Sequence, residues 1–270
     1  MRRFTAEYLR RTREGMWDDS REALADLDLS TRTRILDVGA GTGELSRVLA
    51  AASDAEVVCL DADRSLLSVA RADTGLSAVA GDATRLPFVD DAFDLVVCQA
   101  LLVNLPDPAQ VLREFGRVSS ELVAAVEPDN AAVGVDSTVE AEVELERRVR
   151  EAYLDGVETD VALGDRLPAL FSAAGLSDVR TSRYHHDKSV APPYSEADLE
   201  DAKRKATGEG LAAHETELRR ALSGETYDVL RRDWREMGRT VVEQMREREY
   251  RRAEVVPFDV VVGRVGPSLS

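Results

Sequence analysis

Cysteine is scarce in this sequence of 270 residues, in which Cys59 and Cys98 are the two present and each lies inside an apolar run. Two cysteines are too few for a disulfide framework or for a zinc site built on thiolates. We interpret both as small core residues, and we predict no metal site.

Long apolar runs are also missing. The sequence has no run of about 18 apolar residues, the length at which a membrane-spanning helix is considered. Its first residues lead into charged sequence rather than into the apolar core of a signal peptide. We therefore expect a cytoplasmic protein with no membrane span.

Lysine is nearly absent. Among 35 basic residues only Lys188, Lys203 and Lys205 are lysines, and 51 acidic residues bring the formal net charge to −16. This composition suggests a halophile, in which carboxylates hold water and cations at the surface and salt screens their repulsion. No basic stripe with interleaved aromatic residues occurs, so a nucleic-acid partner is not expected.

From Arg32 to Val126 short apolar runs alternate with helix-like stretches. Such alternation is typical of a parallel sheet covered by helices. Strands are predicted at 33–38, 56–60, 77–80, 93–98 and 121–126, and helices at 43–52, 64–72 and 107–117.

Beyond Pro128 the pattern becomes mostly helical. Helices are predicted at 139–155, at 166–174 and over much of 195–250, with strands at 178–187 and from Val255 to Val265. The first 28 residues predict one or two helices that either pad the sheet or close over a ligand. Apolar side chains at helical spacing predict a buried stripe rather than a cofactor motif: Tyr227, Leu230, Trp234, Met237, Val241 and Met245.

A strand, a glycine turn and a helix follow one another in Asp37-Val38-Gly39-Ala40-Gly41-Thr42-Gly43-Glu44. Glycine allows the sharp bend and lets a ligand approach the backbone closely. The dinucleotide fingerprint requires a third glycine where Glu44 stands, which weakens the alternative of a nicotinamide-dependent oxidoreductase.

Two carboxylates follow the next strands. Asp61 directly follows the second strand and can accept both hydroxyls of a ribose. Asp82 follows the third strand, where it can accept a hydrogen bond from an adenine amino group. Together with the glycine turn they outline an adenosine site.

These stretches resemble the class I S-adenosylmethionine-dependent methyltransferases, in the small-molecule branch related to ubiquinone and menaquinone methyltransferases. The resemblance is close over residues 32–128, and its most specific parts are Asp37 to Gly43 and Gly81 to Val97. It implies a Rossmann-like α/β fold, with a seven-stranded, mostly parallel sheet, an antiparallel last strand and helices on both faces. It also implies S-adenosylmethionine as cofactor.

The resemblance further implies the cofactor contacts. The glycines would lie beneath the methionine part, Asp37 would orient its amino group, Asp61 would hold the ribose, Asp82 would recognise the adenine edge, and Gln99 would lie near the transferring methyl. The full predicted set is Asp37, Gly39, Ala40, Gly41, Gly43, Asp61, Ala62, Asp82, Ala83 and Gln99.

We expect one methyltransferase domain over residues 1–270. Within it we expect an N-terminal helical cover at 1–30, a cofactor-binding core at 31–194, a helical insertion at 195–250 as substrate cap, and the last strand at 251–270.

The general base is not identified by the sequence. His185 or His186 could deprotonate an acceptor, although strand alternation points them to opposite faces and an exposed strand end is the competing interpretation. Glu127, with Asp129 two residues later, could orient a nucleophile or could cap the following turn.

We predict methyl transfer to an oxygen, nitrogen or carbon nucleophile of a small molecule. A methyltransferase for protein or RNA, a protein that binds the cofactor without turnover, and the oxidoreductase remain as alternatives. The acceptor and the oligomeric state stay open, and a homodimer is one of the states that the sequence allows.

Overall fold

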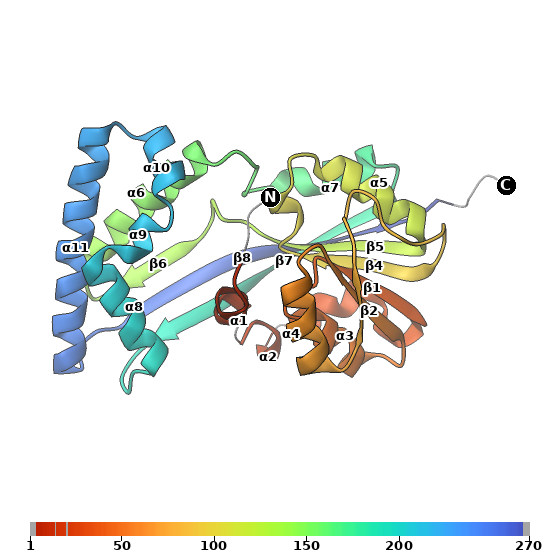
Figure 1. Ribbon diagram of the computed structural model, residues 1–270, viewed down its shortest axis with the longest axis horizontal. Coiled ribbons are helices and arrows are strands. Elements are labelled where there is room, and N and C mark those ends of the chain that lie inside the picture. Colours follow the sequence, from red (N-terminus) through yellow and green to blue (C-terminus); the bar gives the residue numbers. More distant parts are fainter. Residues whose placement is uncertain (1–3, 14, 20, 267–270) are drawn as a thin grey trace. The chain divides into compact units, whose positions relative to one another are not determined.

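The computed structural model describes residues 4–13, 15–19 and 21–266, so the outer ends of the predicted cover and last strand, 1–3 and 267–270, lie outside the described residues. The chain forms two compact units (Figure 1). Unit 1 consists of the described residues of Met1–Asp129, Leu163–His185 and Pro257–Ser270. Unit 2 consists of Asn130–Ala162 and His186–Val256.

A parallel sheet organises unit 1. Its parallel strands, in the order β3-β2-β1-β4-β5, are β1 (Arg34–Val38), β2 (Glu56–Asp61), β3 (Ser77–Ala80), β4 (Phe93–Gln99) and β5 (Ser119–Pro128). The strand β8 (Arg252–Arg264) runs antiparallel to β5, with Leu122 opposite Arg264 and Pro128 opposite Phe258. β7 (Ser177–Val190) pairs with β8. The predicted Rossmann-like α/β fold is therefore confirmed.

Alternation along the strands creates a core on each face of this sheet. On one face Ile35, Leu95 and Val97 pack in the cluster that contains the apolar side chains of α3 (Glu44–Ala52). On the other face Leu36 and Val96 pack in the cluster that contains those of α5 (Pro108–Val118) and α7 (Leu167–Ala173). α4 (Arg64–Thr74) begins after Asp63, whose carboxylate accepts from the backbone N–H of Ser65, as the predicted N-cap requires.

The N-terminal segment is helical, as predicted. It contains the helices α1 (Ala6–Arg13) and α2 (Met16–Asp19), followed by the 3-10 turns η1 (Arg21–Leu27) and η2 (Leu29–Thr31). Met16, Trp17, Leu24 and Leu27 are buried in the same core as α3. This segment therefore pads one face of the sheet and at the same time reaches the ends of its strands.

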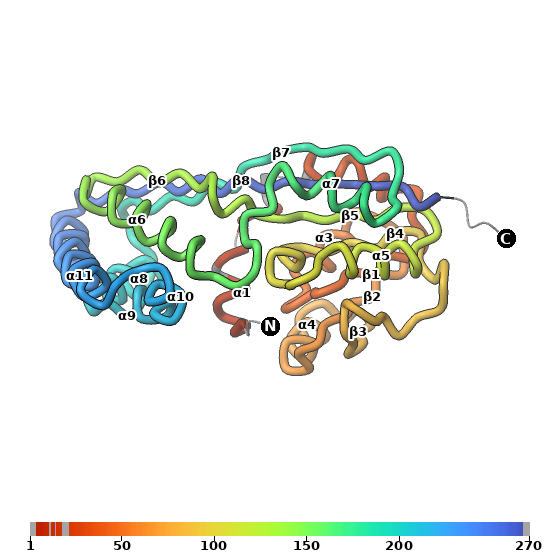
Figure 2. The backbone as a smooth tube through the Cα atoms, turned by 90° about the horizontal axis from the view of Figure 1, so that it is seen from above, coloured from red at the N-terminus to blue at the C-terminus, as the bar shows by residue number. Residues whose placement is uncertain are grey.

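Unit 2 is mainly a group of helices, which Figure 2 shows side by side. They are α6 (Glu140–Gly156), α8 (Glu196–Thr207), α9 (Glu209–Ala212), α10 (Glu215–Ala221) and α11 (Gly224–Glu247). The predicted stripe from Tyr227 to Met245 is buried along α11, so its interpretation as core is confirmed.

The short strand β6 (Gly134–Ser137) was not predicted. It pairs antiparallel with the first part of β8, from Gly134 opposite Val255 to Ser137 opposite Arg252, and makes the sheet eight-stranded rather than seven-stranded. Four residues are too few to display a strand periodicity. The long-range pairing with β8 defines this strand.

The bounds of the units differ from the expected core and insertion, because residues 130–162 belong to the same unit as the later helices. α6 packs against α10 and α11. Within the part of the chain that the structure describes, no helix is both long enough and apolar enough to cross a membrane.

Candidate functional site

The glycine turn joins the end of β1 to the start of α3. Gly39, Gly41 and Gly43 have φ values of 72°, 56° and 83°, in the left-handed region that other residues rarely adopt. The amides of Gly39 and Ala40 donate to the carbonyl oxygen of Leu60 at 2.7 and 3.0 Å. Each glycine is therefore required by the backbone conformation, and the turn is fastened to the end of β2.

Asp61 stands beside this turn at the carboxyl end of β2. Its Oδ2 accepts from the amide of Gly41 at 2.9 Å, and its Oδ1 accepts from the amide of Asp63 at 2.8 Å. A carboxylate has about four acceptor sites, so the two oxygens retain capacity for two more donors. A pair of ribose hydroxyls would match that capacity.

Asp37 is buried beneath the turn. The hydroxyl of Ser46, on α3, donates to its Oδ2 at 2.6 Å, while its Oδ1 has no hydrogen-bond partner among the described residues. Burial raises the pKa of Asp37 to about 6, against the opposing effects of Ser46 and Arg13. We did not predict Ser46, although a hydroxyl on the buried, otherwise apolar face of a helix next to a glycine turn was a usable signal.

Asp82 and Ala83 follow β3, next to the strand that ends in Asp61. The Oδ1 atom of Asp82 accepts from the amide and the hydroxyl of Thr84, both at 2.8 Å, which closes a local turn. Asp82 and Ala62 are exposed, and Ala83 is buried. Asp61 and Asp82 therefore lie on neighbouring strand ends, as predicted.

Gln99 is buried at the end of β4, beside the N-terminal segment. Its Nε2 donates to the sulfur of Met16 at 3.1 Å, and its Oε1 has no hydrogen-bond partner within residues 4–13, 15–19 and 21–266. Its backbone carbonyl oxygen accepts from Nη2 of Arg13 at 3.3 Å.

Side chains of α1 and of the loop after β4 cover the glycine turn. A Cβ atom on Gly41 would lie 2.9 Å from Cδ1 of Leu9, and one on Gly39 would lie 2.9 Å from Cδ1 of Leu101. Burial lowers the pKa of Arg13, while the charges of nearby carboxylates oppose that change. Arg13 is thus a cation held in an acidic site.

Glu127 is engaged by the backbone. Its carboxylate accepts from the amides of Leu101, Leu102 and Val103 at 3.0, 2.9 and 3.3 Å. Burial raises its pKa to about 7, although these three donors act in the opposite direction. Its visible function is to anchor the 3-10 turn η3 (Leu102–Asn104), which follows β4.

Asp129 belongs to a separate ion pair. Nη2 of Arg183 donates to Asp129 at 2.9 Å, and the same guanidinium binds both carboxylate oxygens of Asp259 at 2.8 Å. These contacts join β5, β7 and β8 near the end of β5. The guanidinium of Arg183 thus lies beside Asp129. The sequence did not predict this pairing.

The two candidate histidines differ in burial and fall in different units. His185 is exposed and ends its segment of unit 1, whereas His186 is buried and begins the next segment of unit 2. This alternation follows the predicted strand geometry. Burial lowers the pKa of His186, and its Nε2 has no hydrogen-bond partner within the described part of the chain. A catalytic role for either histidine stays a prediction.

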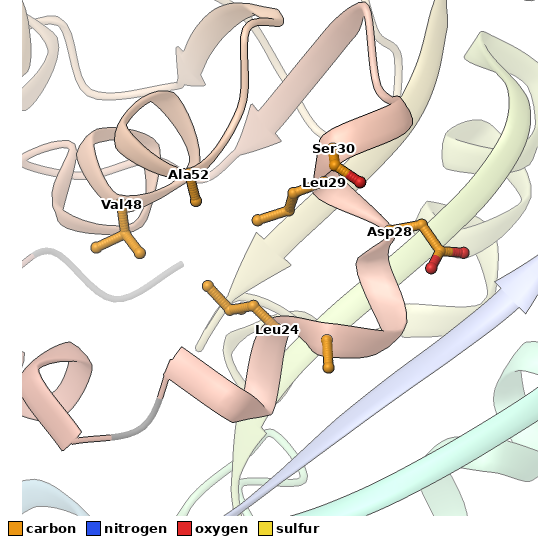
Figure 3. A pocket seen from close by; sticks show the side chains of 7 residues that line it. Leu24, Asp28, Leu29, Ser30, Val48 and Ala52 are labelled. Atoms are coloured by element: carbon orange, nitrogen blue, oxygen red, sulfur yellow. The ribbon is translucent and has the colours of Figure 1, made fainter.

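A small hollow of about 280 Å³ lies elsewhere on unit 1, between η1, η2 and α3. Figure 3 shows Leu24, Leu29, Val48 and Ala52 around it. Val48 and Ala52 lie well along α3 from the glycine turn that precedes it. The hollow is therefore distinct from the glycine turn.

The residues at the turn fit S-adenosylmethionine. Gly39 and Gly41 supply backbone without Cβ atoms, and the unpartnered acceptors Asp37 Oδ1 and Gln99 Oε1 suit an ammonium group. No cluster of three or more potential metal ligands occurs among the described residues.

The fold is Rossmann-like, and the glycine turn with Asp61 beside it is the candidate cofactor site. A methyltransferase domain family matches residues 36–121. The demethylmenaquinone methyltransferase of Mycolicibacterium vanbaalenii is 36% identical over 183 residues, which cover 60% of this chain and 74% of that protein. That of Mycobacterium sp. (strain KMS) is 42% identical over 99 residues, 37% of this chain and 42% of that protein. The matched part of the chain spans less than half the length of this second relative.

Solved structures show the same fold. The BH2331 protein of Bacillus halodurans C-125 has a TM-score of 0.54 at 17% identity, over 93% of this chain and 100% of that one. The protein in complex with the Trm112 methyltransferase activator of Haloferax volcanii has a TM-score of 0.52 at 19% identity, over 97% and 96% of the two chains. The chain belongs to the class I S-adenosylmethionine-dependent methyltransferases, and the cofactor predicted from the resemblance is confirmed.

Proposed function

We propose that this chain transfers the methyl group of S-adenosylmethionine to an oxygen, nitrogen or carbon nucleophile of a small molecule. The observation that carries the proposal is the junction of Asp61 with the glycine turn, through the 2.9 Å hydrogen bond from the Gly41 amide. This hydrogen bond joins a carboxylate that can bind a ribose to a glycine backbone that a ligand can approach closely. Both lie at the carboxyl ends of parallel strands, where open α/β sheets bind ligands.

Each part of the cofactor has a proposed partner in unit 1. Gly39, Ala40, Gly41 and Gly43 lie beneath the methionine part, and Asp37 orients its amino group through the unpartnered Oδ1.

The adenosine half has its own proposed partners. Asp61 receives the ribose hydroxyls, Ala62 and Ala83 flank the adenine, and Asp82 accepts from its amino group. Gln99, at the end of β4, borders the methionine part and the methyl.

The chain acts chiefly by positioning. The bound sulfonium supplies an already activated methyl group for in-line displacement. The strand ends and the turn fix the cofactor, and correct alignment of the reacting groups lowers the barrier by about 7–11 kcal/mol. The N-terminal segment, whose Met16 accepts from the side chain of Gln99, excludes water from the reacting groups.

The acceptor is proposed to be a small molecule. Relatives named demethylmenaquinone methyltransferase support this branch and make a quinol-type ring one acceptor to test first. His185, His186 and Glu127 remain candidate bases. Of these, Glu127 is the weakest, because three backbone amides already occupy its carboxylate.

The test of the cofactor site is the isosteric replacement Asp61→Asn. We expect it to weaken binding of S-adenosylhomocysteine by about tenfold or more in calorimetric titration, since hydrogen bonds to charged groups contribute about 1.5–3 kcal/mol. Asp54→Asn is the matched control, because Asp54 is exposed and precedes the opposite end of β2. Unchanged affinity in folded Asp61→Asn and Asp61→Ala proteins would refute the proposed site.

The test of the acceptor class uses S-adenosylmethionine labelled on its methyl group. We expect label in the small-molecule fraction of an extract, and a quinol-type acceptor is tried in purified form. Transfer to RNA or to protein alone would overturn the small-molecule assignment.

The setting is proposed to be a saline cytoplasm. The net charge of −16 and the scarcity of lysine support this, because such a surface is soluble and stable where salt screens its charges.

A further inference from the structure

Helix α1 carries a cation into the methionine part of the proposed cofactor site. Nη2 of Arg13 donates to the backbone carbonyl oxygen of Gln99 at 3.3 Å, and its Nη1 lies 3.6 Å from the position of a Cβ atom on Gly41. Gly41 and Gln99 are the positions proposed to border the methionine group. The guanidinium therefore lies between the residues that would contact it.

The acidic side chains around Arg13 would attract the cofactor as they attract the guanidinium. Four carboxylates interact with the guanidinium, those of Asp37, Glu44, Glu127 and Asp61. S-adenosylmethionine carries an ammonium, a sulfonium and a carboxylate, so its net charge in this region equals that of one guanidinium. Arg13 and the cofactor can neutralise the same acids, but they cannot occupy the same space together.

The covered turn also leaves polar groups unsatisfied. Asp37 Oδ1, Thr42 Oγ1 and Gln99 Oε1 are buried and have no hydrogen-bond partner within the described residues. Leu9 presents only carbon to Gly41. Buried groups of this kind cost free energy until a partner reaches them. The covered arrangement is therefore a poorer partner for the acids and the turn than a bound ligand would be.

We propose that Arg13, with Leu9, is an internal competitor of the cofactor, which occupies the methionine part of the site in the free protein and withdraws with α1 when the cofactor binds. This inference rests on the proposed function, because it needs the methionine group to lie between Gly41 and Gln99.

With competition of this kind, the apparent Kd equals the intrinsic Kd divided by the fraction of molecules that are open. If about one molecule in ten is open, the apparent Kd is about tenfold above the intrinsic value. Arg10 helps to hold the closed state, because its Nη2 pairs with Asp73 of α4 at 2.6 Å. Loss of this exposed pair should favour opening less strongly than loss of Arg13 does.

The experiment measures the Kd of S-adenosylhomocysteine by calorimetry for the full chain and its variants. We expect Arg13→Gln to bind about tenfold more tightly than the natural chain. This factor follows if about one molecule in ten of the natural chain is open and the variant is mostly open. The affinity of this variant for S-adenosylmethionine should rise at least as much, since the sulfonium replaces the missing cation. Arg10→Gln should bind more tightly by a smaller factor and provides a second variant that retains the buried residues.

Two controls separate competition from a general change in charge. Arg13→Lys keeps a cation on α1 and should stay near the natural affinity. Arg34→Gln removes an exposed cation at the opposite end of β1, where Arg34 pairs with Glu56, and should leave the Kd unchanged.

The outcomes are distinguishable. Weaker or unchanged binding by Arg13→Gln and Arg10→Gln, while the natural chain binds and Asp61→Asn weakens binding, would overturn the competitor and leave the cofactor site intact. Absence of binding by the natural chain would instead overturn the proposed function, and the competitor with it.

Discussion

The carboxyl group of Asp37 is expected to titrate where cofactor binding can be measured, because burial raises its pKa to about 6. In the proposed cofactor site an ionised Asp37 attracts the ammonium group of the cofactor, and a protonated Asp37 does not. Affinity for S-adenosylhomocysteine should therefore fall as the pH is lowered from 8 through about 6 to 5.

The check is a series of titration calorimetry experiments between about pH 5 and 8, with Asp37→Asn as the variant that lacks this titration. The variant should bind more weakly at pH 8 and change less with pH. Glu127→Gln tests the other raised carboxyl pKa, which is about 7. If Asp37→Asn kept the full pH dependence, another group would be responsible.

Single residues also show the limit of sequence reasoning. The position of Asp61 at a strand end beside the glycine turn could be predicted, because both features depend on residues close together in the chain, while its contact with a ribose stays a prediction. The neighbourhood of Arg13 could not be predicted, since it depends on contacts of α1 with Gly41 and Gln99, which are 28 and 86 residues further along the chain.

At the scale of elements, Glu127 anchors the turn η3 by accepting from three consecutive amides. In Glu127→Gln one oxygen becomes an NH₂ group that faces a backbone donor, so the free energy of unfolding should fall by about 1–3 kcal/mol at pH 8. The loss should be larger at pH 5, because folding raises the pKa of Glu127 to about 7 and the protonated side chain therefore adds stability to the natural chain below that pH. Urea unfolding at the two pH values measures it.

Glu56→Gln is the control for this change, since Glu56 is exposed and pairs with the half-exposed Arg34 at 3.3 Å. A surface pair of this type contributes about 1 kcal/mol or less. Equal losses in the two variants would argue against the anchoring role of Glu127.

Glycine also permits a close helix crossing in unit 2. A Cβ atom on Gly238 of α11 would meet the backbone of Lys205 and Ala206 on α8, with the Cα of Ala206 at 2.7 Å. Backbone cannot yield as a flexible side chain can. Gly238→Ala should therefore lower the free energy of unfolding by about 1–3 kcal/mol, the usual cost of overpacking.

Gly224→Ala provides a matched comparison on the same helix. No atom lies within 4 Å of a Cβ on Gly224, so this variant should equal the natural chain or gain up to about 1 kcal/mol from the greater helix propensity of alanine. Equal stability of the two alanine variants in urea would show that α8 and α11 do not approach closely at Gly238.

At the scale of the whole molecule, the net charge of −16 predicts a dependence on salt. The screening length falls from about 10 Å at 0.1 M salt to about 3 Å at 1 M, so repulsion among surface carboxylates weakens. The melting temperature should rise as KCl increases from about 0.1 to 2 M. Thermal unfolding followed by circular dichroism tests this, and greater stability at low salt would remove the halophile hypothesis.

The order and type of most elements could be predicted, because periodicity, caps and glycine turns are local. The helix predicted at 64–72 is α4 (Arg64–Thr74), and the strand predicted at 77–80 is β3 (Ser77–Ala80). The four-residue strand β6 and the membership of residues 130–162 in unit 2 could not be predicted, since both rest on partners more than a hundred residues away or on helix packing.

The sequence by itself determined the alternation of strands and helices, the glycine turn and the carboxylates Asp61 and Asp82 at neighbouring strand ends, because each depends on residues close together in the chain. Only the tertiary structure decided that Ser46 bonds Asp37, that Glu127 is enclosed by backbone amides and that Arg13 lies over Gly41. The physical reason is that burial and pairing of a charged side chain are set by the elements that pack around it. Those elements come from distant parts of the chain.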